Sequence, residues 1–297
     1  MLDFSKIKTI PIKERKNKVK LSDLIEPENS EIKINSKELD ELAERIVLAY
    51  KNKKQVILMM GAHVIKVGMS LLIIDLIKKN VIKHIAMNGA GPIHDFELAL
   101  AGETSEYVEK TIENGTFGMA EETGRILNEA IKEGAKNNYG MGYVMGKKIS
   151  DLNLPNKEYS ILYNAYKLKV PVTVHVAIGT DIIHQHPSCD GASVGKTTYN
   201  DFKIFAESAS RLEKGVILNV GSSVILPEIF LKALTIARNL GFKVENFTAA
   251  NLDMIDQYRP RENVVQRPTS LGGKGFMIIE KHEKTIPTLH RKIVDKI

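Results

Sequence analysis

Residues 55–91 read QVILMMGAHVIKVGMSLLIIDLIKKNVIKHIAMNGAG, and this stretch decides the fold class. The run at 55–60 is short and almost wholly apolar, which is typical of a strand buried on both faces of a sheet. A predicted helix at 68–80 follows it, and a second apolar run at 84–88 ends in Gly-Ala-Gly. The stretch therefore predicts a strand–helix–strand unit with parallel strands.

The same alternation continues toward the C-terminus. Short apolar runs predict further strands at 172–176, 216–220, 244–248 and 275–280. Helical spacing of apolar residues predicts helices at 36–52, 121–135, 158–169, 200–213 and 226–240. A glycine-rich loop is predicted around Gly140, Gly142 and Gly146. We therefore predict an α/β fold with a doubly wound, mostly parallel, Rossmann-like sheet.

The N-terminal segment differs in composition from the rest of the chain. Residues 1–36 are polar and rich in Lys and Pro, and we predict an extended basic arm there, followed by a single α/β domain at 37–297. Residues 1–20 hold seven basic and two acidic side chains, so the rest carries only about +1 of the net charge of +6. We expect a solvated arm and no nucleic-acid partner, because aromatic residues are only 6% of the chain and Trp is absent.

Composition also bounds the compartment. No run approaches the roughly 20 apolar residues that span a bilayer, so no membrane span is predicted. The single Cys189 excludes a disulfide framework and fits a reducing compartment. We expect a cytoplasmic protein.

Ligands of doubly wound sheets bind beyond the carboxyl ends of the strands, so residues that follow predicted strands are the site candidates. Small residues at such an end let a dinucleotide approach the backbone, and neighbouring polar groups can bind it. The cofactor candidates on this basis are Gly68, Asn88, Gly89, Ala90, Gly91, Asp95, Gly221, Thr248 and Asp253. The alternative for 88–97 is a tight turn before a capped helix, with Asp95 acting on a helix dipole.

The loop at 179–197 is the most polar after any predicted strand. With Cys189, the histidines His184 and His186 could ligate zinc, although their spacing matches no standard zinc motif. The letters GASVGKT resemble a phosphate-binding loop, but Asp190 stands where that motif requires glycine.

A second polar segment lies at 251–262. Its carboxylates, among them Asp256 and Glu262, could bind a cationic amine, or they could form exposed ion pairs with nearby arginines. Lys274 lies among glycines, and partial burial would free its amine for imine chemistry. Histidines such as His94 and His186 could move protons near pH 7.

From about Gly61 to the C-terminus, the chain resembles deoxyhypusine synthase and its bacterial relatives. Residues 68–95 align without a gap with the family's first NAD segment. Asp253-x-x-Asp256 and the following Arg259-Pro-x-Glu262 look like its acidic segment, and Gly273-Lys274 looks like its Gly–Lys pair. The family's active-site histidine falls near Glu228, and Asp181 falls on a spermidine-contacting acid.

The resemblance implies an NAD-dependent enzyme that transfers an aminobutyl-type group from a polyamine such as spermidine. It implies catalytic roles for Lys274, His94, His186 and Glu228, with the amine bound by Asp181, Asp256 and Glu262. A small amine, a possible protein lysine acceptor and a homotetramer with sites at subunit interfaces are the implied partners. Two alternatives stay open: a metal-assisted hydrolase or lyase using His184, His186 and Cys189, and a non-catalytic nucleotide-binding module.

Overall fold

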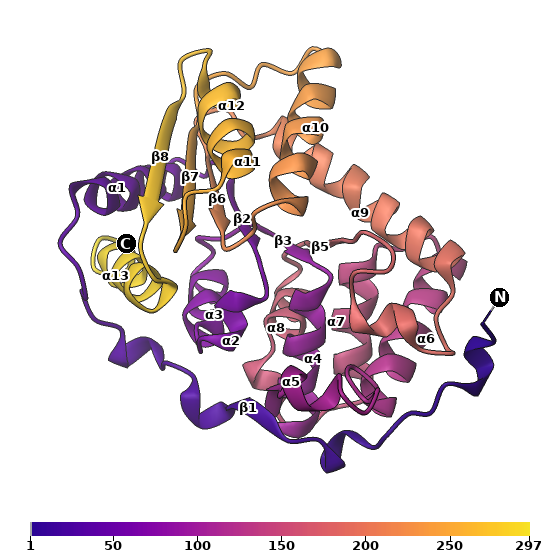
Figure 1. Cartoon of the computed structure of the whole chain (residues 1–297). Helices are drawn as coiled ribbons and strands as arrows, with labels where there is room; N and C mark the ends of the chain where they lie inside the picture. The colour runs from indigo at the N-terminus through magenta and orange to yellow at the C-terminus, as the bar shows by residue number, and fades with distance from the viewer. Residues whose placement is uncertain (1) are drawn as a thin grey trace.

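The computed structural model describes residues 2–297, in which six parallel strands form the central sheet (Figure 1). The strands are β2 (Val56–Met60), β3 (His84–Asn88), β5 (Val172–His175), β6 (Val216–Val220), β7 (Thr248–Asp253) and β8 (Lys274–Ile279). Their order is β5–β3–β2–β6–β7–β8, so the chain winds outward from β2 in one direction and from β6 in the other. This order confirms the doubly wound, Rossmann-like fold and places its switch point between β2 and β6.

Helices cover both faces of the sheet (Figure 1). One face packs against α1 (Lys37–Lys51), α3 (Ser70–Lys78), α4 (Ala90–Ala101), α7 (Met141–Asp151), α8 (Ile161–Leu168) and α13 (His282–Val294), and α6 (Glu121–Lys136) packs against α7 and α9. The other packs against α9 (Gly191–Ser210), α10 (Ile225–Asn239) and the π-helix η7 (Arg261–Gln266). Short helices are α2 (His63–Lys66), α5 (Val108–Thr111), α11 (Tyr258–Pro260) and α12 (Arg267–Thr269). Each face of the sheet has its own hydrophobic core. Strand β2 contributes side chains to both cores, because successive side chains point to opposite faces.

Two predicted elements are wrong. The strand expected at 244–248 is β7, which begins at Thr248, because its sequence TAANLD has a single β-branched residue and no apolar run that marks a strand. The loop expected around Gly142 and Gly146 is helix α7. A Cβ on Gly142 would collide with the Val172 carbonyl, so these glycines permit close helix packing rather than a turn.

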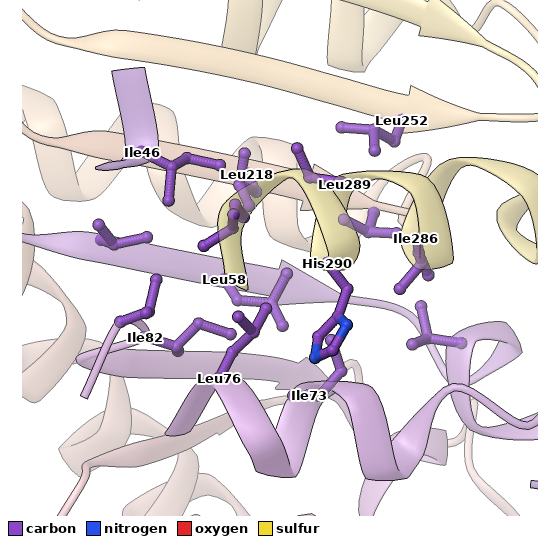
Figure 2. A pocket seen from close by; sticks show the side chains of 15 residues that line it. Ile46, Leu58, Ile73, Leu76, Ile82, Leu218, Leu252, Ile286, Leu289 and His290 are labelled. Atoms are coloured by element: carbon purple, nitrogen blue, oxygen red, sulfur yellow. The ribbon is translucent and has the colours of Figure 1, made fainter. Parts of the chain in front are cut away.

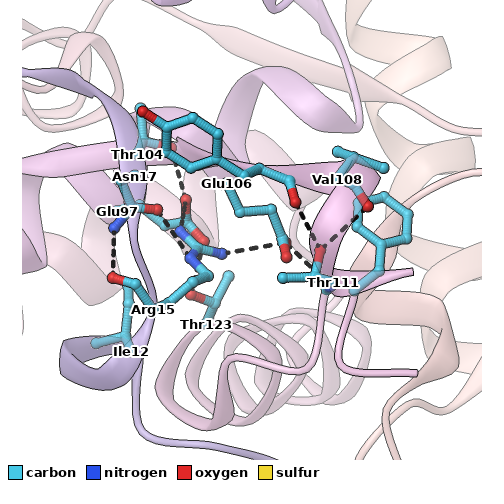
Figure 3. A network of polar contacts seen from close by, with 12 residues as sticks. Ile12, Arg15, Asn17, Glu97, Thr104, Glu106, Val108, Thr111 and Thr123 are labelled. Atoms are coloured by element: carbon cyan, nitrogen blue, oxygen red, sulfur yellow. Dashed lines mark hydrogen bonds and ion pairs between the residues drawn. The ribbon is translucent and has the colours of Figure 1, made fainter. Parts of the chain in front are cut away.

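The N-terminal arm is docked, which corrects the expectation of a solvated segment. Its strand β1 (Asn17–Lys20) pairs antiparallel with β4 (Glu103–Glu106). Just before β1, the buried Arg15 guanidinium lies 2.6 Å from Glu97 and 3.5 Å from Glu106 (Figure 3). Buried ion pairs fix the arm to α4 and β4.

The core beneath α13 contains a small apolar cavity of about 30 Å³ (Figure 2). The His290 ring at its edge points from α13 toward α3, where its Nε2 lies 2.9 Å from Asp75. Its Nδ1 lies 2.9 Å from the Ser30 hydroxyl of the arm. His290 thus joins the arm, α3 and α13. Over residues 2–297, none of the helices combines the length and apolarity that a membrane crossing requires.

Candidate functional site

The switch point lies where the turns after β2 and β6 meet. The Gly61 N–H donates to the Val220 carbonyl at 2.9 Å, and a Cβ on Gly61 would collide with the Gly221 carbonyl. Gly221 has φ +66°, a left-handed conformation that glycine adopts without strain. The turn after β2 therefore packs directly against the turn after β6 and leaves no space for a ligand between them. Space at the carboxyl edge of the sheet lies at the start of α10.

A mostly apolar groove of about 530 Å³ opens there, between the carboxyl end of β5 and helices α9 and α10. Its lining includes Val176, Tyr199, Phe202, Val224 and Ile229. Helix α10 has 15 residues and begins beside the groove. Its N-cap residue Val224 makes no capping hydrogen bond, and the Leu226 N–H of its first turn donates to the Ser222 hydroxyl at 3.4 Å. Because a helix N-terminus favours negative charge, the groove and this terminus together fit a ring that carries a phosphate group.

Glu228, a predicted catalytic residue, lines this groove. Its carboxylate contacts Lys232, lies 3.4 Å from Arg259 and accepts a hydrogen bond from Asn263 at 2.8 Å. The Lys232 contact is the largest cause that lowers its pKa. Glu228 is therefore ionised at neutral pH and suits charge binding better than proton donation.

Asp181 lies on the other side of the strand end. Its side chain is 8% exposed and packs on Gly89, where a Cβ would collide with the carboxylate and with Val176. Burial raises the pKa of Asp181 to about 6, and its Oδ2 has no hydrogen-bond partner in residues 2–297. Since Val176 also lines the groove, the orphaned carboxylate and the groove are separated by about one side chain.

His184 stands beside this carboxylate. Its Nδ1 accepts hydrogen bonds at 3.2 Å from the N–H groups of Gly179 and Asp181, and it lies 3.9 Å from Asp181 Oδ2. Because Nδ1 is an acceptor, the proton of the neutral ring is on Nε2, which is buried without a partner in the described residues. Neighbouring residues at this end of the sheet thus each hold an unsatisfied polar atom, Oδ2 of Asp181 and Nε2 of His184.

A histidine pair at the same edge was not predicted from the sequence. His63 of α2 and His282 of α13 have ring centroids 5.5 Å apart, and His282 Nε2 lies 3.1 Å from the Leu252 carbonyl. Burial is the largest cause that lowers the pKa of His63, and Asp253 and Glu283 act in the opposite direction. His282 follows β8, so the rule about strand ends would have found it.

The glycine-rich end of β3 leads directly into α4. Gly89 is the N-cap of α4, and the side chain of Asn88, the last residue of β3, accepts from the Gly91 N–H of the first turn at 3.2 Å. Asp95, predicted to bind the cofactor, is instead fully buried and accepts hydrogen bonds from Ser160, Ile161 and Leu162 at the start of α8. Asp95 therefore stabilises the start of α8. This agrees with the alternative that it acts on a helix dipole, although the helix is α8 and not its own helix α4.

Replacing Asp95 by alanine is expected to lower the free energy of unfolding by about 1–3 kcal/mol, because three donors at the start of α8 lose their acceptor. NAD affinity is expected to stay unchanged. Urea unfolding and an NAD titration measure the two quantities. Weaker NAD binding with unchanged stability would instead support the cofactor role.

Three predicted residues serve the packing around the arm and the β5–α9 loop. His94 Nδ1 lies 2.7 Å from the Thr104 hydroxyl, and burial lowers the pKa of His94 to about 4. The Gly68 carbonyl accepts from the Ile25 N–H of the arm at 2.9 Å. His186 packs on Gly124 and lies 2.7 Å from the Gly118 carbonyl. These contacts indicate structural roles.

The histidines and Cys189 of this loop are not arranged as metal ligands. Throughout residues 2–297, no group of three or more His, Cys, Asp or Glu side chains could hold a metal ion. The letters that resembled a phosphate loop form the start of α9, with Asp190 as its cap.

The predicted amine-binding acids beyond β7 are engaged by arginines of their own segment. The exposed Asp256 pairs with Arg261, and Glu262 lies 3.3 Å from Arg267. This is the alternative of local ion pairs, which contribute little when exposed. Asp253, at the end of β7, does lie at the carboxyl edge.

Thr248 and Lys274 lie at the amino edge of the sheet. They are paired residues at the starts of β7 and β8, and both line a groove on that side. One chain therefore does not bring Lys274 to Asp181 or to the α10 groove. Thr248 was expected after a strand because β7 was expected four residues too early.

Comparisons with known proteins show the fold. No family model matches the chain, and no curated protein matches it significantly. Solved structures that resemble it include ArgZ, an arginine dihydrolase of the ornithine–ammonia cycle in cyanobacteria (TM-score 0.55, 14% identity, 86% of this chain). AgrE in a ternary complex with ornithine and NAD⁺ gives a TM-score of 0.53 with 11% identity over 88% of this chain.

A protein from Entamoeba histolytica, provisionally called a deoxyhypusine synthase, gives a TM-score of 0.53 with 12% identity. The match covers 88% of both chains. The chain spans only about a third of ArgZ and AgrE, 31% and 34% of their lengths. At these identities the likeness establishes the fold and leaves the activity open.

Proposed function

We propose that this protein is an NAD-dependent enzyme that acts on an amine at the carboxyl edge of its sheet. The observation that carries the proposal is the apolar groove at the start of α10, one side chain away from the Asp181 carboxylate, whose Oδ2 has no partner in residues 2–297. The groove suits a neutral ring, the helix start suits a phosphate, and the carboxylate suits a cation.

The comparisons support this combination. AgrE, which shares the fold, has been seen with both NAD⁺ and ornithine, an amino acid with a side-chain amine. The protein from Entamoeba histolytica has a provisional assignment to the family that the sequence resembles. Both are consistent with a nicotinamide nucleotide and an amine on this fold.

Different residues would bind the amine and exclude water from the ring. Asp181 would hold a protonated amine by a charge-assisted hydrogen bond, and the amine would supply the partner that its Oδ2 lacks. Tyr199, Phe202 and Ile229 would exclude water from the ring. NAD⁺, when bound, supplies a hydride acceptor for the carbon that bears the amine.

Aminobutyl transfer through a lysine is the finer form of this proposal. It needs a lysine beside the amine, and Lys274 enters only if another copy of the chain, as in a homotetramer, brings it to the carboxyl edge. Spermidine is one candidate donor, and a protein lysine is one candidate acceptor.

Charge at the start of α10 tests the proposal. Val224 is 47% exposed and lines the groove, so Val224→Glu would place a carboxylate where a phosphate is expected. We expect the dissociation constant for NAD to rise at least tenfold in Val224→Glu, and to change less than threefold in the uncharged match Val224→Gln. An acid at a helix start does not destabilise the helix, so the fold should be retained.

Titration calorimetry and thermal unfolding with NAD measure this effect. A ligand at 100 times its dissociation constant stabilises by about 2.7 kcal/mol, which thermal unfolding detects. Absence of NAD binding to the unmodified protein would contradict the proposal. NAD binding without NADH formation from di- or polyamines would favour the nucleotide-binding module instead.

A further inference from the structure

A row of buried polar groups lies beneath α9, on the face of the sheet that bears the groove. Ser208 of α9 lies 2.7 Å from Nδ1 of His84, and Nε2 of His84 lies 3.0 Å from the Thr173 hydroxyl. The same hydroxyl lies 3.0 Å from Nε2 of His175. Phe205 packs edge-on against both imidazoles, with centroids 5.4 and 5.5 Å away. The row therefore has a fixed geometry.

The row ends at His175, which has an unsatisfied ring nitrogen. His175 lines the groove and is 1% exposed, and its Nδ1 has no hydrogen-bond partner within residues 2–297. Burial lowers the pKa of both His84 and His175 to about 3, so both rings are neutral at physiological pH. Each ring then carries one proton.

Ser208, His84, Thr173 and His175 each carry one donor, and the row has three hydrogen bonds, so one donor stays unused in any arrangement. In one arrangement the Ser208 hydroxyl donates to His84 Nδ1, and the unused donor is then on His175, the residue of the row that lines the groove. His84 then carries its proton on Nε2 and donates to Thr173, and Thr173 donates to Nε2 of His175. The proton of His175 is consequently on Nδ1.

We propose that His175 is a specificity-determining residue of the groove, whose Nδ1–H donates a hydrogen bond to the carboxamide oxygen of a nicotinamide ring. The inference rests on the proposed function, because it takes the occupant of the groove to be NAD. The groove adjoins Val176 and, through it, Asp181, so a ring in the groove lies beside the amine and is the redox-active one. Ser208, His84 and Thr173 position the donor.

Binding measurements with two nucleotides test the contact. His175→Phe removes the donor and keeps a ring of similar shape, and we expect it to weaken NAD binding about tenfold, which corresponds to about 1.4 kcal/mol. ADP-ribose, which lacks nicotinamide, should bind the variant and the unmodified protein equally. Equal weakening of both ligands, or no weakening of NAD, would overturn the inference.

The row itself gives a second test. Thr173 does not line the groove, so Thr173→Val breaks the row without changing the groove, whereas Thr173→Ser keeps the hydroxyl. We expect NAD binding to weaken about threefold in Thr173→Val and to be retained in Thr173→Ser. This pair carries the test if His175→Phe does not fold. Equal NAD affinity in the two variants would contradict the positioning role.

Nitrogen-15 NMR of the ligand-free protein reads the tautomer without NAD. We expect the His175 signals of an Nδ1–H ring near pH 7, and a mixture of tautomers in Thr173→Val. An Nε2–H ring in the unmodified protein would overturn the assignment. If the unmodified protein does not bind NAD, the proposed function fails as a whole; if it binds NAD and His175→Phe binds it equally, only this inference fails.

Discussion

Replacing Arg15 by alanine is expected to lower the free energy of unfolding by about 3–5 kcal/mol, the largest loss from one substitution in the N-terminal arm. The Arg15 side chain is 3% exposed, and those of Glu97 and Glu106 are 1% and 5% exposed. Alanine would leave both carboxylates buried without their counter-ion (Figure 3). The expected loss comes from these two buried carboxylates, which would remain charged without a partner.

Further hydrogen bonds make the cluster around Glu97 sensitive to this loss. Glu97 also accepts from Thr104 at 2.5 Å and from Thr123 at 3.0 Å, and Arg15 Nε donates to Asn17 at 2.9 Å. Because Glu97 belongs to α4, which begins at the Gly89 turn beside Asp181, loosening the arm is expected to disturb the candidate site as well.

The matched control is Lys18→Ala in the same arm. Lys18 lies 3.3 Å from Glu109, but their side chains are 41% and 63% exposed, so we expect a loss below about 1 kcal/mol. Urea unfolding of both variants measures the difference. Comparable losses in the two variants would contradict a buried anchor.

The strands that define the candidate site were predictable because they are continuous apolar runs. The runs at 84–88 and 216–220 coincide with β3 and β6, so Asn88 and Gly221 were placed correctly at the carboxyl edge. Strand β7 was not, because Asn251 interrupts it and is tolerated only through a 2.7 Å hydrogen bond with Asn219 of β6. That partner is 32 residues away in sequence, and no local pattern reveals it.

Single polar residues were harder to interpret than clusters. His175 stands between valines in the run VTVHV, and its importance depends on Thr173 and His84, which only the folded sheet brings together. The opposite error affected Asp256, because a dense group of acids suggested a cation site although Arg261, five residues away, already neutralises it. Sequence spacing can indicate local ion pairs of this kind, whereas the burial of a side chain is known only from the folded structure.

Replacing Asp181 by asparagine is expected to raise the stability of the ligand-free protein and to abolish amine binding. Burial raises the pKa of Asp181 to about 6 from 3.8, and this difference corresponds to about 3 kcal/mol against the carboxylate, reduced by residual solvent contact. Between pH 4 and 6 the folded protein holds a proton that the unfolded chain has released, so this group's contribution to stability falls as pH rises through that window. Asparagine carries no charge and avoids the penalty.

The expected result is therefore specific in its pH dependence. Asp181→Asn should match the unmodified protein at pH 4 and exceed it by about 1–3 kcal/mol at pH 8, as measured by urea unfolding at both pH values. Asp95 and Asp201, whose pKa values burial also raises, are present in both proteins and cancel in the comparison. The same variant should lose at least a hundredfold in turnover of any amine that the unmodified protein oxidises with NAD⁺, because the cation loses its charged partner.

Asp190→Asn is the control from the same loop. Hydrogen bonds from Ser193 lower the pKa of Asp190 and it caps α9, so asparagine, a good cap itself, should change neither the pH profile nor amine turnover. A gain in stability together with a loss of activity is the pattern of a residue kept for binding rather than folding. If Asp181→Asn instead destabilises the protein at pH 8, the carboxylate has a partner in solution, and the amine site proposed around it must be abandoned.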